Sequence, residues 1–181
     1  LKKIEIGIVI KQDLLENQAK LSYLAIGSNL GNRKMYIEKA KFELQNYKIK
    51  ISKCSEKFET LSWPNPLNPK FINIVIEIKT YLSSLELLVI CNLIEKKLGR
   101  TRSKKNSPRS CDIDIIDYDQ KVINSKEKNL VLPHPRMSKR NFVLLPLFQI
   151  NKTWKHPESS KNITNLLNSL PIKDLRSIKQ L

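Results

Sequence analysis

The stretch Pro108-Arg109-Ser110-Cys111-Asp112-Ile113-Asp114-Ile115-Ile116 alternates acidic and apolar residues from Cys111 onward. This period of two is typical of a β-strand with one buried face. Cys111, Ile113 and Ile115 would form the row that faces the core. Asp112 and Asp114 would share the opposite face, one pleat apart. We therefore expect a strand that presents a pair of carboxylates.

The acid pair is a candidate metal site. Two neighbouring carboxylates each disfavour ionisation of the other, and a cation between them removes that cost. Paired oxygen ligands suit Mg²⁺, which proteins hold with one or two carboxylates plus substrate phosphates. Arg109 lies just upstream, where its planar guanidinium could meet a phosphate. The alternative is an exposed strand face with two solvated acids, which the poor strand propensity of Asp disfavours.

Working outward from this strand, the chain predicts a strand-helix-strand-strand-helix-strand order. We expect strands at 21–26, 51–60 and 71–79, a helix at 33–48, a helix from Ser83 to Leu98 that begins with a capping box, and the strand from 112. A hairpin through Asp119-Gln120 and a short amphipathic helix at 162–170 would follow. The predicted fold class is α/β (α+β): a ferredoxin-like split βαβ sheet with helices on it and appended strands.

Length and composition limit the class of protein. A chain of 181 residues with 40% hydrophobic and 28% charged residues is expected to fold as one globular domain. We place that domain at 21–181 and treat 1–20 as an N-terminal extension of unknown role. No apolar run is long enough to span a membrane, and no segment is typical of a signal peptide. Three widely spaced cysteines indicate a reducing, cytoplasmic location, and two histidines argue against a zinc site.

The formal net charge of +16 raises nucleic-acid binding as an alternative function. Most of the cations are lysines, in a chain rich in Asn and Ile and poor in Gly, so a solvated surface is the simpler interpretation. Of the seven arginines, three lie between positions 100 and 109. That clustering suits a polyanionic small substrate as well as it suits nucleic acid. The aromatic signature of RNA-binding sheets is absent, so we expect no nucleic-acid partner.

Several motifs together resemble one enzyme family, 6-hydroxymethyl-7,8-dihydropterin pyrophosphokinase. In chain order they are Ala25-Ile-Gly-Ser-Asn-Leu-Gly31, Phe71-Ile-Asn73, Gly99-Arg-Thr-Arg102, Pro108-Arg109 with Asp112-Ile-Asp114, Pro133-His134, and Arg140-Asn-Phe142. The resemblance runs from about residue 21 to the C-terminus. It implies transfer of pyrophosphate from ATP to the hydroxymethyl oxygen of the pterin, with release of AMP, in tetrahydrofolate biosynthesis. It also implies two Mg²⁺ ions, ATP as co-substrate and a cytoplasmic monomer with no membrane partner.

The resemblance implies a role for each matching residue. Asp112 and Asp114 would bind the metal, and with Arg100 and Arg109 they would form the catalytic set. The residues that would bind ATP are Asn92, Glu95, Arg102, Arg109, Ile115, His134 and Arg140. The pterin would lie between Phe71 and Phe142, with Asn73 and Thr60 contacting its edge. The chain departs from the family at Asn106-Ser107, where Trp-Gly is common.

Other phosphotransfer and nucleotide-binding classes lack their motifs. There is no G-x-x-x-x-G-K-[ST] loop of a P-loop kinase and no G-x-G-x-x-G of a dinucleotide-binding fold. An inactive relative of the pyrophosphokinases remains an alternative, although the metal and arginine positions are all present.

Overall fold

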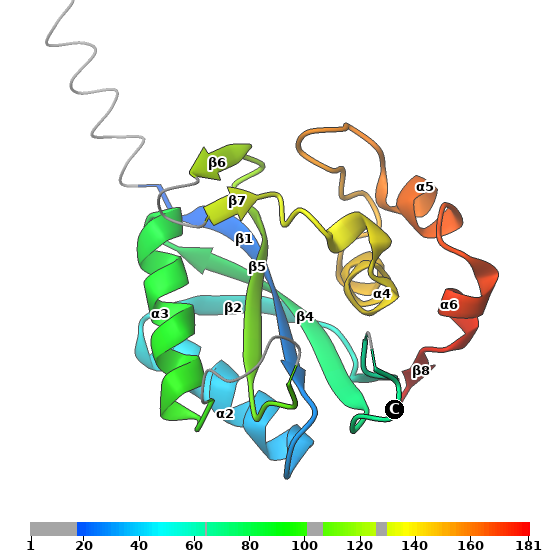
Figure 1. Ribbon diagram of the computed structural model, residues 1–181. Coiled ribbons are helices and arrows are strands. Elements are labelled where there is room, and N and C mark those ends of the chain that lie inside the picture. Colours follow the sequence, from blue (N-terminus) through cyan, green and yellow to red (C-terminus); the bar gives the residue numbers. More distant parts are fainter. Residues whose placement is uncertain (1–17, 64, 101–106, 126–129) are drawn as a thin grey trace, which may run out of the picture.

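The computed structural model describes residues 18–63, 65–100, 107–125 and 130–181 and contains a six-stranded antiparallel sheet (Figure 1). Its strands are β1 (Lys20–Ser28), β2 (Lys50–Cys54), β3 (Phe58–Thr60), β4 (Phe71–Thr80), β5 (Asp112–Tyr118) and β8 (Lys179–Gln180). The helices are α2 (Arg33–Asn46), α3 (Ser84–Lys97), α4 (Asn141–Ile150), α5 (Ile163–Asn168) and α6 (Ile172–Arg176), with a 3₁₀ turn at Met137–Lys139. A separate ribbon pairs β6 (Ile123–Ser125) with β7 (Leu130–Leu132). The mixed α/β class is as expected.

The sheet order is β5-β1-β4-β3-β8, and β2 also pairs with β4. The single strand expected at 51–60 is instead two strands, β2 and β3. The interruption lies at Ser55, whose backbone N–H donates to Val75 O at 2.9 Å while its hydroxyl accepts from Val75 N–H at 3.0 Å. A side chain thus replaces a backbone partner, which breaks the ladder locally.

Helices α2 and α3 cover one face of the sheet (Figure 1). The alternating isoleucines of β4 point to this face and are buried with Ile37, Ala40 and Leu44 of α2. Helix α3 begins at the predicted capping box, in which Ser83 N–H donates to Glu86 and Glu86 N–H donates to the Ser83 hydroxyl. Gly99 follows the helix at φ +83°, a conformation that favours glycine.

Helices α4 and α5 pack on the opposite face, over Tyr23, Val75 and Ile116. The predicted helix near 162–170 is confirmed as α5, with Asn162 as its N-cap. The buried indole of Trp154 donates to Asp117 Oδ2 at 2.8 Å and so attaches the C-terminal segment to β5.

The hairpin expected through Asp119-Gln120 is wrong. Both residues do form a turn, at φ +54° and +53°, but β6 pairs with β7 and not with β5. The edge of β5 instead pairs with β1, and Asp119 N–H donates to Leu21 O. The turn is held by Gln120, which donates to the Asp117 carboxylate through its backbone N–H and its side chain.

The topology brings the predicted functional residues to one end of the sheet. Because the strands are antiparallel, the end of β1 adjoins the beginnings of β4 and β5. The acid pair and Asn73 therefore share the face on which α4 packs. Within the described part of the chain, no helix has the length and apolar character needed to cross a membrane.

Candidate active site

Asp112 and Asn73 lie in one row across the sheet, on either side of Gly27. Gly27 is paired with Asp112 on β5 and with Asn73 on β4. A Cβ atom added at Gly27 would lie 2.8 Å from Asn73 Oδ1 and 3.4 Å from the Phe71 ring. The absence of a side chain at Gly27 thus lets the Asn73 amide and the Phe71 ring lie close against the β1 backbone.

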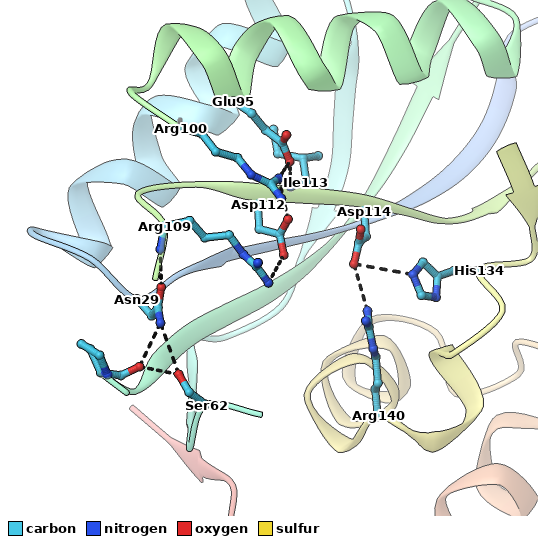
Figure 2. Close-up of polar contacts among 11 residues, drawn as sticks. Asn29, Ser62, Glu95, Arg100, Arg109, Asp112, Ile113, Asp114, His134 and Arg140 are labelled. Carbon is cyan, nitrogen blue, oxygen red and sulfur yellow. Dashed lines mark hydrogen bonds and ion pairs between the residues drawn. The ribbon is translucent and has the colours of Figure 1, made fainter. Parts of the chain in front are cut away.

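Asp112 is enclosed by two arginines (Figure 2). Arg100 Nη1 lies 2.7 Å from its Oδ1, and Arg109 Nη2 lies 2.9 Å from its Oδ2. Burial, and then the nearby charge of Asp114, raise the pKa of the Asp112 carboxyl above its ordinary value. The site thus disfavours an uncompensated anion at this position and supplies cations to balance it.

Asp114 faces a second cation and a histidine (Figure 2). Arg140 Nη1 lies 2.9 Å from its Oδ2, and His134 Nε2 lies 3.7 Å away. Burial lowers the pKa of His134, so the ring is neutral near pH 7. Its Nδ1 accepts from Arg136 N–H at 3.1 Å, which leaves the proton on Nε2, directed to the site.

Glu95 supports this arrangement from beneath the strand. Its carboxylate accepts from the N–H of Ile113 at 2.7 Å and from Arg100, the arginine that contacts Asp112. Burial raises the pKa of Glu95 to about 7. Through these two contacts, the Glu95 carboxylate orients β5 and the Arg100 guanidinium.

Asn29 forms a structural connection that was not predicted, since the sequence indicated it only as one residue of the motif from Ala25 to Gly31. It is almost fully buried, and its Oδ1 accepts from Arg109 N–H at 2.7 Å. Its Nδ2 donates to Ser62 Oγ at 3.2 Å and to Pro69 O at 3.1 Å (Figure 2). One side chain thus fixes the backbone of Arg109 to the loop that precedes β4. Because Asn29 lies among polar residues typical of a turn, nothing in the sequence near it indicates this contact.

The predicted pterin contacts lie beside the acid pair. Asn73 Nδ2 donates to Thr60 Oγ1 at 3.0 Å, and Thr60 is paired with Phe71 in the sheet. The Arg109 guanidinium lies 5.3 Å from the centroid of the Phe71 ring. The Arg140 guanidinium lies 5.4 Å from that of Phe142, so each predicted aromatic contact has a site arginine over its ring.

Two other predicted positions are not brought to the acid pair, and a third cannot be placed. Ile115 lies on β5, but its side chain is buried in the core under α2 and α3, on the face opposite to the acids. Asn92 is exposed on α3 and donates to Leu88 O of its own helix. Arg102 lies outside the described residues.

The donor set fits a magnesium ion bound together with a phosphate ligand. Among the residues described here, no cluster of three or more His, Cys, Asp or Glu side chains could hold a metal alone. Asp112 and Asp114 supply two carboxylates on one strand face, and Mg²⁺ takes its remaining ligands from phosphates and water. Arg109 Nε is buried and has no hydrogen-bond partner, so the site retains an unsatisfied donor beside these acids.

The chain matches the family model described as 7,8-dihydro-6-hydroxymethylpterin-pyrophosphokinase over residues 23–152. It is 39% identical to the 2-amino-4-hydroxy-6-hydroxymethyldihydropteridine pyrophosphokinase of Bacillus subtilis, over 72% of this chain and 77% of that protein. Identity to the Aquifex aeolicus enzyme of the same name is also 39%, over 75% of this chain and 82% of that protein.

Longer relatives contain the same region. The folic acid synthesis protein fol1 of Pneumocystis carinii is 35% identical over 92% of this chain, which spans only 22% of that protein. A crystal structure of Plasmodium falciparum HPPK-DHPS with pterin and p-hydroxybenzoate has a TM-score of 0.71 and 16% identity, over 91% of this chain and 48% of that chain. At this identity the likeness shows a shared fold.

Proposed function

The chain belongs to the 7,8-dihydro-6-hydroxymethylpterin-pyrophosphokinase family, and from that premise we propose that it transfers pyrophosphate from ATP to 6-hydroxymethyl-7,8-dihydropterin in folate biosynthesis. The products are AMP and the pterin diphosphate. The observation that carries the proposal is the acid pair Asp112 and Asp114, which three arginines contact and of which Asp112 lies in one row with Asn73.

In this reaction the hydroxymethyl oxygen attacks the β-phosphorus of ATP. The bond between the β-phosphorus and the oxygen that bridges it to the α-phosphorus breaks, and AMP leaves with that electron pair. The hydroxyl proton passes to solvent. Because the attacked atom is the middle phosphorus, the protein must hold the phosphate chain on both sides of it.

The arginines are placed for this task. Arg100 and Arg109 contact Asp112, and Arg140 contacts Asp114. A guanidinium group pairs equally well with a carboxylate or a phosphate, as a planar fork of donors. We expect these cations to exchange part of their carboxylate contacts for phosphate contacts when ATP binds. Held in place before the reaction, they stabilise the charge that develops as AMP leaves.

Asp112 and Asp114 would hold the magnesium, which would neutralise negative charge on the phosphates and on the departing AMP. The neutral His134 would donate a hydrogen bond to a phosphate oxygen through Nε2, since its other nitrogen is occupied as an acceptor.

The pterin is recognised next to this phosphate site. Asn73 offers a paired donor and acceptor to the pterin edge, and Thr60 already orients the amide. Phe71 and Phe142 would pack on the ring. A ligand that left the buried Asn73 amide unpaired would be rejected at a cost of several fold in affinity.

The proposal extends to the organisation of the protein. The catalytic domain is residues 21–181, with the ferredoxin-like split βαβ arrangement as its centre and residues 1–20 as an extension. It acts as a cytoplasmic monomer on small molecules and has no nucleic-acid partner. The sheet order around β5, β1 and β4 supports the split βαβ arrangement, and the predominance of lysine in the net charge supports the absence of a nucleic-acid partner.

The test is a product assay with ATP, Mg²⁺ and the pterin, followed by separation of AMP from ADP. We expect AMP in amounts equal to the pterin diphosphate. The variant Asp114→Asn should lower turnover by about 100-fold or more, because a neutral amide is a poor magnesium ligand. The matched control is Asp119→Asn, an acid in the turn at the far end of β5, which should leave turnover unchanged. Near-normal turnover of Asp114→Asn would refute the metal role.

A further inference from the structure

Residues 171–181 lie beyond the matched family segment 23–152 and contact two parts of the candidate pterin site. They contain α6 and β8, which run past α4 to the outer edge of the sheet (Figure 1). We propose that this segment, here called the C-terminal clamp, fixes the two sides of the pterin site relative to each other and thereby sets the affinity for the pterin. The inference rests on the proposed function, because it concerns the residues to which that function assigns the pterin.

The first contact of the clamp is with β3. Strand β8 pairs antiparallel with β3, with Lys179 opposite Glu59, and Leu181 N–H donates to Lys57 O at 2.9 Å. Strand β3 has only three residues, and its other neighbour is β4. Without β8 it would be a short edge strand with unpaired backbone groups, and such segments open readily. Its last residue is Thr60, which accepts the hydrogen bond of Asn73.

The second contact is with the first turn of α4. Asn141 Nδ2 donates to Asp174 O and to Ser177 Oγ, the latter at 3.3 Å. Its Oδ1 accepts from the N–H of Phe142 at 2.7 Å. A single amide group therefore joins the clamp to the backbone of Phe142. Leu175 of α6 packs in the same apolar cluster as the Phe142 side chain.

The two contacts are close together in the chain. Ser177 contacts Asn141 and Lys179 is paired with Glu59, so only Ile178 lies between them and the span is two residue steps. A span of two residues reaches at most about 7 Å. While both contacts hold, β3 and the start of α4 cannot move apart. Widening the space around a bound ring by 0.5–1 Å would lose a quarter to a half of its dispersion energy, so this restraint favours pterin binding.

The clamp makes no contact with the phosphate side of the site. Among the contacts of the described residues, none joins 171–181 to Asp112, Arg109 or Arg100. Loss of the clamp should therefore weaken pterin binding without weakening nucleotide binding. If residues 171–181 only stabilised the fold, their loss would weaken pterin binding and nucleotide binding alike.

The experiment compares the full chain with a chain that ends at Leu170 and with the variant Lys179→Pro. Proline removes a backbone donor and is excluded from the interior of a strand ladder, so it detaches β8 while leaving α6 in place. The matched control is Lys179→Ala, because the Lys179 side chain is exposed and its backbone pairing is kept. We measure KM for the pterin, kcat, and the Kd of a non-hydrolysable ATP analogue in the absence of pterin.

We expect KM for the pterin to rise roughly five- to tenfold in the truncated chain and in Lys179→Pro, at an unchanged Kd for the ATP analogue. Lys179→Ala should match the full chain. An unchanged pterin KM in either folded disrupting variant would overturn the inference, as would an equal loss of pterin and nucleotide affinity. If the truncated chain does not fold, Lys179→Pro decides the outcome.

The full chain separates this inference from the proposed function. If it forms AMP and the disrupting variants keep its pterin KM, only the clamp is refuted. If it forms no AMP and does not bind the pterin, the proposed function fails and the clamp fails with it.

Discussion

The carboxylate of Glu95 accepts a hydrogen bond at 2.7 Å from the backbone N–H of Ile113, the residue between the two acids of β5. Glu95 is one of the few buried acids of the chain, and it also contacts Arg100. The Glu95 side chain, from α3, thus holds the backbone of β5 between the two acids and also contacts Arg100, which pairs with Asp112. The ionisation of Glu95 is therefore linked to the stability of the site.

Glu95 predicts a pH dependence of stability. Burial raises its pKa from 4.5 to about 7, so the folded protein binds a proton that the unfolded chain has released between these values. The free energy of unfolding of the wild type should therefore fall as the pH rises through this window, relative to Glu95→Gln, by an amount on the order of 3 kcal/mol. Urea unfolding of both proteins from pH 4.5 to 8 measures this. Parallel curves would contradict it.

Gly27→Ala tests the close approach of the Asn73 amide to the β1 backbone. The new Cβ would lie 2.8 Å from Asn73 Oδ1, so the amide must move from the position that Thr60 now orients. We expect KM for the pterin to rise by about tenfold or more, because small displacements of a recognition group are costly. The Kd of an ATP analogue should stay unchanged. An unchanged KM for the pterin would show that the pterin does not contact Asn73.

Asn29→Ala tests the connection between Arg109 and the loop before β4. The substitution leaves the Arg109 N–H without its partner, which should lower the free energy of unfolding by about 2 kcal/mol. It should also raise KM for ATP several fold, because the Arg109 backbone then keeps only the hydrogen bond from the residue 29 N–H to Arg109 O. The control Ser62→Ala removes a partner of Asn29 but leaves Arg109 held. If Ser62→Ala and Asn29→Ala have equal KM values for ATP, Asn29 does not position Arg109.

Local pattern was sufficient for much of the fold and part of the site. The alternation along β5 predicted that Asp112 and Asp114 share one face of their strand, and the alternating isoleucines of β4 leave Asn73 on the other face of that strand. The capping box of α3 could be predicted because Ser83 and Glu86 are three residues apart. In each case the interaction that decides the structure lies within a few residues.

The features that were missed depend on contacts between distant segments. Asn29 and Arg109 are 80 positions apart, and nothing near either residue indicates that they meet. The two polar residues of β8 have no periodicity, and they become a strand only because β3 offers an edge. The hairpin at Asp119-Gln120 was predicted from turn residues alone, but β6, the strand that follows the turn, pairs with β7 and does not return along β5.

The central claim is that two phosphates of ATP leave together from a site built on Asp112, Asp114 and their arginines. The most direct measurement uses ATP labelled at both the β- and the γ-phosphorus, with Mg²⁺ and the pterin, and follows each label into the products. We predict that both labels enter the pterin product in equal amounts and that the AMP carries neither. Transfer of the γ-label alone, with the β-label retained in ADP, would contradict the account.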